Sequence, residues 1–286
     1  GVPPPPPSPR SSCRRRATHS GPCGCVVPVT GAVASGEMGV TARAAWAQTS
    51  ALANYGSAVF GPNHPMPAGT TWSSVAAGDW PYASIAYLDV NGREVNTAAY
   101  GAGAWQITTT GFDKSGTVLT QLAALARDEA LSPGSYPDTD PYVRGVADSP
   151  SRAGLLSTNN TYSSDGTELI DTVGPMHPTL LTDGTTLDTR AHVHTLYDEN
   201  APSGGPFRLP TTITAAAQAA DAVDHDAVTT QKSYDPIVAG DTSGWTLRRP
   251  TKVTTVMAAA PNIVRITRYD VQGRVIETRM PANTSG

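Results

Sequence analysis

A short motif, an aromatic residue followed by Asp with Gly a few residues later, recurs along the chain and constrains the fold more than any other feature. Its aromatic residues Tyr162, Tyr197, Tyr234 and Tyr269 lie 35, 37 and 35 residues apart. Self-similarity at a fixed period of this size is typical of repeat architectures, in which each unit buries its apolar face against its neighbours. The sequence therefore predicts an array of similar supersecondary units.

Each motif predicts a strand, a tight turn and a returning strand. The aromatic residue ends the first strand and supplies a large apolar face. Asp opens the turn by bonding the backbone two residues on, Gly takes the position with positive φ, and Arg begins the return strand. The motif residues are Tyr87, Asp89, Gly92 and Arg93; Phe112, Asp113 and Gly116; Tyr162, Asp165 and Gly166; Tyr197 and Asp198; Tyr234 and Asp235; and Tyr269, Asp270, Gly273 and Arg274.

The composition agrees with a mainly β fold. Charged residues make up only 15% of the chain, against roughly 25% in average domains, and 27 Gly and 25 Pro punctuate it. We expect four hairpins, centred near Asn91-Gly92, Ser115-Gly116, Asp165-Gly166 and Gln272-Gly273.

One helix is expected among these strands. Val118, Leu122 and Leu125 recur at helical spacing, which predicts a short amphipathic helix over 118–131. Ser132-Pro133-Gly134 ends the run, and the following residues to about Asn160 read as a long surface loop rich in Pro, Asp, Ser and Gly.

The first fifty residues differ from the rest. Five consecutive prolines and an arginine run at 14–16 lead into small residues without periodicity. Such a segment buries too little apolar area to offset its ordering entropy, so we expect residues 1–50 to be disordered and residues 51–286 to form the repeat region. Four residues of this segment are potential zinc ligands, but Cys13, His19, Cys23 and Cys25 fit none of the common spacings, and no metal is expected there.

Sequence motifs of catalysis are missing. The chain contains no G-x-S-x-G, P-loop, G-x-G-x-x-G or H-E-x-x-H pattern, so we expect no catalytic centre and no cofactor. A net charge of −4 gives no general reason to expect binding to nucleic acid. No apolar run approaches the length of a membrane span.

Two histidines leave an alternative open. His192-Val193-His194 places two imidazoles on one side of a strand, where Asp188 or Asp198 could complete a zinc site. The simpler interpretation, which we favour, puts both histidines on the solvent side and Val193 in the core. We therefore expect no metal at this pair.

Two further groups have simple interpretations. The acidic run at 221–226 lacks the ligand spacing and the Gly of a calcium loop, which indicates a solvated loop. Trp72, Trp80, Trp105 and Trp245 could form a sugar-stacking surface, but aromatic residues in strands usually belong to the core.

The motif resembles the YD repeats of the bacterial Rhs (rearrangement hotspot) proteins, which teneurins share. Residues 268–275 match the pattern R-Y-D-x-x-G-R-[LV] at every defined position, and residues 87–93 match with one extra residue between Tyr and Asp. The other four motifs are degenerate, and those at Tyr197 and Tyr234 lack Gly-Arg at the expected distance. Residues 84–281 as a whole resemble the repeat region of long actinobacterial Rhs-type wall-associated proteins.

This resemblance implies a container. In the family, antiparallel strand-turn-strand repeats wind into a continuous sheet that spirals into a hollow β-shell, and in bacterial members the shell encloses a C-terminal toxin. It implies a non-catalytic fragment of a polymorphic toxin that is extracellular or associated with the cell wall. The implied partners are the rest of the array and the toxin. The alternative is a β-rich module that binds cell-wall carbohydrate or a partner cell surface.

Overall fold

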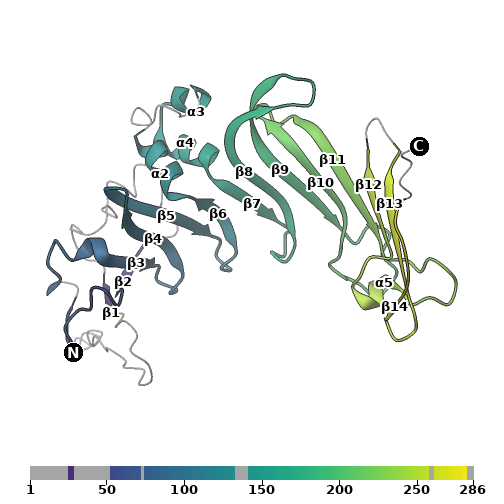
Figure 1. Cartoon of the computed structure of the whole chain (residues 1–286), viewed down its shortest axis with the longest axis horizontal. Coiled ribbons are helices and arrows are strands. Elements are labelled where there is room, and N and C mark those ends of the chain that lie inside the picture. The colour runs from purple at the N-terminus through teal and green to yellow at the C-terminus, as the bar shows by residue number, and fades with distance from the viewer. Residues whose placement is uncertain (1–24, 29–51, 72–73, 133–140, 258–260, 282–286) are drawn as a thin grey trace, which may run out of the picture. The chain divides into compact units, whose positions relative to one another are not determined.

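A computed structural model of the chain describes residues 25–28, 52–71, 74–132, 141–257 and 261–281 (Figure 1). Its regular structure is mainly antiparallel β-strand with a few short helices, which confirms the predicted fold class. The chain divides into two compact units, residues 1–157 and residues 158–286. Each unit is described by itself below.

The first unit is a sheet whose strands follow one another in chain order. The strands are β1 (Cys25–Pro28), β2 (Tyr55–Phe60), β3 (Ala83–Leu88), β4 (Glu94–Gly101), β5 (Ala104–Phe112) and β6 (Val118–Leu122), each antiparallel to the next. A 3₁₀ turn, η2 (Trp80–Tyr82), precedes β3. Apolar residues of the central strands, among them Tyr87, Val95, Ala98 and Ile107, are fully buried and form the core.

Strand β1 lies within the segment that we expected to be disordered. Its four residues pair antiparallel with β2, from Cys25 opposite Ala58 to Pro28 opposite Tyr55. The prediction therefore differs from the structure at these four residues. Elsewhere in 1–50, including Cys13, His19 and Cys23, the prediction lies outside the described residues.

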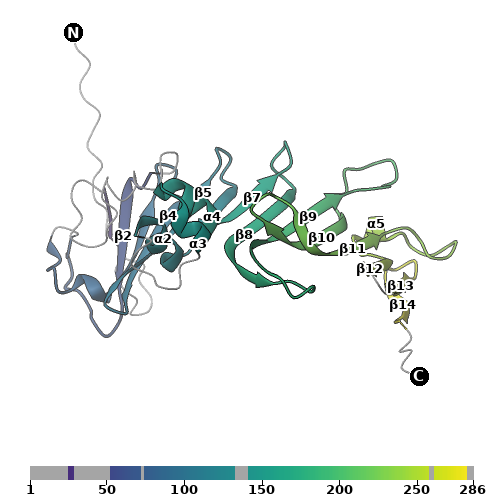
Figure 2. The same ribbon diagram turned by 90° about the horizontal axis from the view of Figure 1, so that it is seen from above.

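The predicted helix over 118–131 is wrong in its first half. Val118–Leu122 forms β6, because hydrogen bonding to β5 outweighs the weak helical periodicity. The helix α2 (Ala124–Leu131) begins only after this strand and lies against β5 (Figure 2).

Two more helices occupy part of the expected loop, α3 (Pro141–Gly145) and α4 (Ser149–Leu156). The side chain of Asp148 caps α4 by accepting a hydrogen bond from the backbone N–H of Ser151 at 2.8 Å, and a proline occupies the first turn. Buried Arg152 then ties the helices together: its Nε donates to the carbonyl oxygen of Ala130 at 2.8 Å, and its Nη1 donates to that of Val146 at 2.8 Å.

The second unit is also a sheet in chain order. Its strands are β7 (Thr158–Tyr162), β8 (Leu169–Leu180), β9 (Thr186–Tyr197), β10 (Pro210–Ala219), β11 (Asp224–Ser233), β12 (Lys252–Val256), β13 (Ile263–Tyr269) and β14 (Val275–Arg279), and each pairs antiparallel with the next. Strand β8 bends along its length (Figure 1), and its register with β9 shifts between Val173 and Met176.

A small aromatic core lies in the connection between β11 and β12. The short helix α5 (Gly244–Leu247) brings the indole of Trp245 within 4.8 Å of the ring of Tyr234 and 5.2 Å of that of Phe207, measured between centroids. The indole N–H donates to Asp235 Oδ1 at 3.0 Å.

The tryptophans thus belong largely to cores. Trp245 and Trp80 are buried, whereas Trp105 is half-buried and meets Tyr100 edge-on at 5.6 Å. Trp72 lies outside the described residues. Among the helices that the structure describes, none is both long and apolar enough to cross a membrane.

Candidate functional site: the repeated turns

All four predicted hairpins are present, and two of them have nearly identical turns. At Asp270, the backbone N–H of Asp270 donates to the carbonyl oxygen of Arg274 and that of Gly273 donates back to Asp270, both at 2.9 Å. The corresponding bonds between Asp89, Gly92 and Arg93 are 2.9 and 3.0 Å long. Gly92 and Gly273 have φ of 77° and 76°, the left-handed conformation that closes a three-residue hairpin loop.

The acidic side chain holds each turn from inside. Asp270 Oδ1 accepts from the backbone N–H groups of Gln272 and Arg274, both at 2.9 Å, and Oδ2 accepts from Arg274 Nε at 2.7 Å. Asp89 makes the equivalent bonds, including one of 2.7 Å from Arg93 Nε. The motif residues Asp, Gly and Arg therefore form one local bonding unit.

The turn at Asp113 has the same pair of backbone hydrogen bonds, which we call the turn frame, but it lacks the arginine. The backbone N–H groups of Ser115 and Thr117 donate to Asp113 Oδ1, each at 2.8 Å, and Gly116 has a φ of 90°. Thr117 stands where Arg stands in the other two turns.

The turn after Tyr162 is one residue longer. Ser163, and not Asp165, opens it: the backbone N–H of Gly166 donates to Ser163 at 2.8 Å, and that of Ser163 donates to Glu168 at 2.8 Å. Asp165 lies within the loop, where the hydroxyls of Ser163 and Thr167 bond it and lower its pKa to about 2.

The same frame occurs at two hairpins that the motif did not reveal. Between β8 and β9, Leu181 stands at the Asp position and Gly184, with a φ of 85°, at the Gly position. Between β10 and β11 these positions are held by Ala219 and by Ala222, which has a φ of 65°. Asp183-Gly184 is a typical hairpin pair that could have revealed the first of these turns from the sequence. The second turn has no Gly, and only the strand pattern on each side signals it.

Two of the predicted motifs open long connections instead of hairpin turns. Asp198 closes the loop between β9 and β10 by accepting from the backbone N–H groups of Phe207, Arg208 and Leu209 at 2.7 to 2.9 Å. Asp235 bonds the indole of Trp245 in the connection between β11 and β12.

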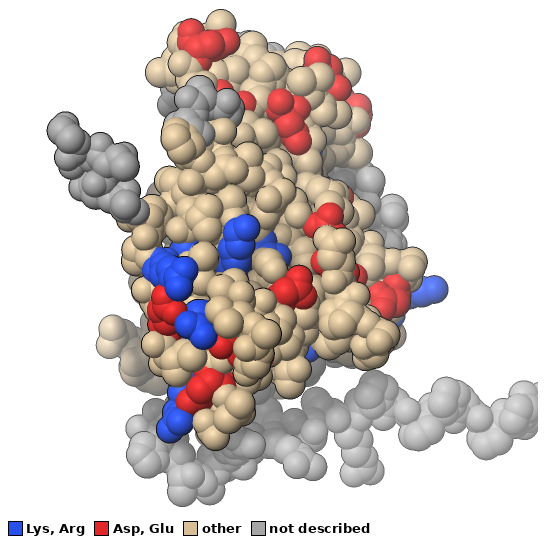
Figure 3. Space-filling view, turned by 90° about the vertical axis from the view of Figure 1, so that its right-hand side faces the viewer, with Lys and Arg blue, Asp and Glu red and all other residues tan. Residues whose placement is uncertain are grey.

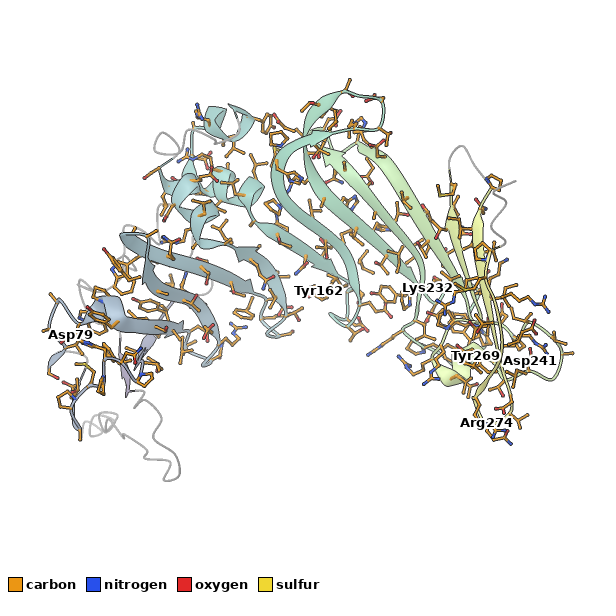
Figure 4. All side chains as sticks on the ribbon, in the orientation of Figure 1. Asp79, Tyr162, Lys232, Asp241, Tyr269 and Arg274 are labelled. Atoms are coloured by element: carbon orange, nitrogen blue, oxygen red, sulfur yellow. The ribbon has the colours of Figure 1, made fainter. Side chains whose placement is uncertain are left out.

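Three of the four repeat tyrosines in the second unit, Tyr197, Tyr234 and Tyr269, share one contact. Each lies at the end of a strand and donates its hydroxyl to a backbone carbonyl at or near the start of the preceding strand. The pairs are Tyr197 with Leu169 at 3.1 Å, Tyr234 with Pro210 at 3.0 Å, and Tyr269 with Pro250 at 3.3 Å. In Figure 4, Tyr269 lies near the turn end of β13, with Arg274 beyond it at the tip.

Tyr87 does not hold the position that the motif assigns to it. The register opposes Leu88 to Glu94, as it opposes Tyr269 to Val275, so Leu88 is the true equivalent of Tyr269. Tyr87 lies one residue earlier and is fully buried in the core of the first unit.

Arg93 also reaches the next turn. Its Nη1 donates to the carbonyl oxygen of Asp113 at 2.7 Å, and its guanidinium carbon lies 4.9 Å from the centroid of the Phe112 ring. With its Nε on Asp89, the side chain joins two successive hairpins. Arg268 makes a comparable bridge through bonds of 2.8 and 3.0 Å to Asp241 and one of 2.7 Å to Glu277.

These bonds keep the turn carboxylates ionised. Burial alone would raise the pKa of Asp89, but the backbone N–H and the guanidinium of Arg93 outweigh burial, and the net pKa is lowered. For Asp270, the backbone N–H of Arg274 and then its guanidinium lower the pKa.

The favoured interpretation of the His192 and His194 pair is wrong for His192 and Val193, whereas the side chain of His194 is 39% exposed as expected. The side chain of His192 is only 12% exposed, whereas Val193, expected in the core, is 36% exposed. The carboxylate that meets both imidazoles is Asp171, at 3.1 Å from His192 Nε2 and 2.6 Å from His194 Nδ1. The carboxylates considered from the sequence, Asp188 and Asp198, are not in this group.

The acidic run at 221–226 does not act as one cluster. Asp221 bonds the backbone N–H of Val223 in its own turn, Asp224 bonds His192, and Asp226 bonds Thr182 in the turn between β8 and β9. Most of the face that Figure 3 shows is uncharged, and basic side chains lie beside acidic ones in its middle and lower part. Arg268 and Arg274 each form an ion pair with an acidic residue.

Comparison with known proteins does not identify a family for this chain. No protein-family model and no curated protein matches the sequence. Among the solved structures that match is the Tc holotoxin pore of Photorhabdus luminescens, in a form with a mutation in TccC3. The alignment covers 82% of this chain and 15% of that chain, at 11% identity and a TM-score of 0.22. A TM-score this low carries no argument about fold or function.

Proposed function

We propose that this chain is a non-catalytic repeat region that forms part of a β-shell, and that the shell encloses or displays a toxin or effector in a secreted or surface-associated bacterial protein. The observation that carries this proposal is the use of the motif residues. At Asp89 and Asp270, the side chains of Asp and Arg bond within their own hairpin turn and so hold it together. Structural repeats need such residues, whereas catalysis needs groups left free to meet a substrate.

The exposed end of the second unit also supports an array. Among the described strands, β14 pairs only with β13, so its other edge presents unpaired backbone groups. Val275 and Ile276 on this strand are 55% and 53% exposed. A further hairpin against this edge would pair the backbone and cover both side chains.

Arg274 fits the same arrangement. Its side chain is 75% exposed, whereas that of Arg93, which contacts the next turn, is 21% exposed. A following hairpin would give Arg274 the carbonyl contact that Arg93 makes with Asp113.

The proposal is tested by protease protection. The chain is expressed together with whatever its gene encodes after residue 286, and the same following segment is expressed alone as the control. We expect the attached segment to resist protease concentrations that degrade the control. Equal rates of cleavage, or a gene that encodes nothing after this chain, would contradict an enclosing shell.

The alternative is a module that binds carbohydrate, and nothing in the described part of the chain specifically favours it. Trp80 and Trp245 are buried and cannot stack on a sugar, and Trp105 is half-covered. Tyr82, which is 60% exposed, stacks on His64 at 4.1 Å between ring centroids. This alternative stays a prediction from the sequence.

A further inference from the structure

The nitrogen atoms of two histidines converge on one carboxylate oxygen in the second unit. His192 and His194 lie on the same side of β9, and β8 places Asp171 directly opposite His194. The ligand atoms of all three residues lie within 4.8 Å of one another. Ligand atoms around tetrahedral zinc, each about 2.0–2.1 Å from the metal, lie roughly 3.3 Å apart. The separation of 3.1 Å between His192 Nε2 and Asp171 Oδ1 is close to this value. His194 Nδ1 lies 2.6 Å from the same oxygen, so these two atoms would have to separate slightly to hold the ion.

A second carboxylate fixes the outer side of His192. Asp224 Oδ1 and Oδ2, from β11, lie 2.9 and 3.0 Å from His192 Nδ1. The Gln218 amide lies farther from the same nitrogen, at 3.2 Å, and also points to Asp224 at 3.4 Å. The shorter distance and the charge of Asp224 favour a proton on Nδ1 that is donated to this carboxylate.

The inner nitrogen of His192 faces the carboxylate that His194 also meets. Either a proton or a metal ion can lie between Nε2 and Asp171 Oδ1, and a metal ion bound there would displace the proton. Metal-binding histidines generally donate their other N–H to a carboxylate, as His192 does to Asp224.

The cluster is accessible and has the donor types that zinc prefers. Two imidazole nitrogens and one carboxylate oxygen form a common three-ligand set for zinc, with a further position left for water. The side chains of His194 and Asp171 are 39% and 27% exposed, so an ion can reach them from solution. All three residues project from paired strands, which limits their movement.

We propose that Asp171, His192 and His194 bind one zinc ion, and that Asp224 orients His192 for this purpose. The ion would cross-link β8 to β9 and keep an open coordination position on the surface of the second unit. Nothing in the repeat pattern requires these residues, since none of them is a motif position. The site is therefore independent of the shell proposed above.

The test is zinc binding by calorimetry on the full chain after treatment with a chelator. Cys13, Cys23 and Cys25 are replaced by Ser in every sample so that thiolates do not compete. We expect one zinc per chain, a raised melting temperature with zinc, and visible absorption bands of tetrahedral symmetry when cobalt replaces zinc.

Three variants and a matched control locate the ion. His192→Ala and His194→Ala should weaken binding by at least about tenfold, and Asp224→Asn by about 10- to 100-fold, as losses of ligands and of their orienting partners do. His177→Ala, which removes an exposed histidine of β8 outside the cluster, should leave binding unchanged. If an alanine variant loses its strand signal in circular dichroism, His→Gln at the same position replaces it.

Two outcomes would contradict the zinc proposal or part of it. Absence of zinc uptake, or uptake that neither histidine variant weakens, would overturn the proposal. Weakening by the histidine variants but not by Asp224→Asn would overturn the orienting role alone.

Discussion

Arg93 Nη1 donates a 2.7 Å hydrogen bond to the backbone carbonyl of Asp113, twenty residues further along the chain. The same guanidinium forms an ion pair with Asp89, whose side chain is 3% exposed. One side chain therefore holds its own turn and fastens it to the next one. This contact links the local chemistry of a motif to the stacking of successive hairpins.

Arg93→Ala should destabilise the first unit far more than Arg274→Ala destabilises the second. Loss of Arg93 leaves the buried carboxylate of Asp89 without its partner, which typically costs about 3 kcal/mol. Arg274 is largely exposed, and its ion pair contributes only about 0.5 kcal/mol. Urea unfolding of the two variants measures the difference, and similar losses would show that the contact with Asp113 adds nothing.

Gly273 and Ala222 occupy the same position in their turns, and exchanging Gly and Ala there should change the stability in opposite directions. Gly273→Ala should destabilise the chain, and Ala222→Gly should stabilise it. Gly273→Ala places a Cβ at positive φ and 2.9 Å from Leu247 Cδ2, so we expect a loss of about 1 kcal/mol or more. Gly273→Val should lose still more. Ala222→Gly should stabilise the chain by about 0.5–1 kcal/mol, because Ala222 already holds a left-handed conformation.

Gly92→Ala serves as the matched control for crowding. Its φ equals that of Gly273 within one degree, but nothing lies within 4 Å of the added Cβ. Thermal melts of the four variants provide the comparison. Destabilisation by Ala222→Gly would contradict the shared turn frame.

The repeat tyrosines should contribute mainly through their rings. Tyr269 is 6% exposed, so Tyr269→Ala should cost about 3–5 kcal/mol, as for other large aromatic residues truncated in a core. Tyr269→Phe and Tyr234→Phe each lose only the hydroxyl bond to a carbonyl, which contributes about 1 kcal/mol. Chemical unfolding checks the order, and equal effects of Phe and Ala at position 269 would exclude burial as the cause.

Low pH should remove the contribution of the Asp89 carboxylate to the stability of the folded chain. Its pKa in the folded chain is lowered from 3.8, so its stabilising effect is present above that value and is lost as the pH falls through the folded pKa. The stability difference between the native chain and Asp89→Asn should therefore be largest near neutral pH and shrink below about pH 4. Asn91→Ala, which removes no titrating group, should show no such trend. A difference that grows in acid would mean that the carboxylate destabilises the turn.

The turns that could be predicted from the sequence are those in which the turn residues themselves determine the backbone conformation. Asp113 and Gly116 specify their turn by themselves, because an acceptor at the first position and a residue free to adopt positive φ at the fourth suffice. The turn at Ala219 escaped prediction because pairing of β10 with β11 imposes it on Ala222, which lacks the chemistry of Gly.

The other errors have separate causes: strand pairing decided two of them, and the third was a local signal that was overlooked. Val118 and Leu122 have helical spacing, yet pairing with β5 makes them part of a strand. The helix α4 had a readable signal, Asp148 followed by a proline in the first turn, that the richness in Ser and Gly obscured. Asp171 could not be assigned to His192 because only the register of β8 and β9 brings them together.

The most direct test of the repeat account is an electron density map of this chain with whatever its gene encodes after it. The account predicts that a further hairpin pairs with the free edge of β14 and covers Val275 and Ile276. The Arg274 guanidinium should then reach a backbone carbonyl of that hairpin, as Arg93 reaches Asp113. An edge of β14 that stays in solvent, with Arg274 bonded only to its own turn, would contradict it.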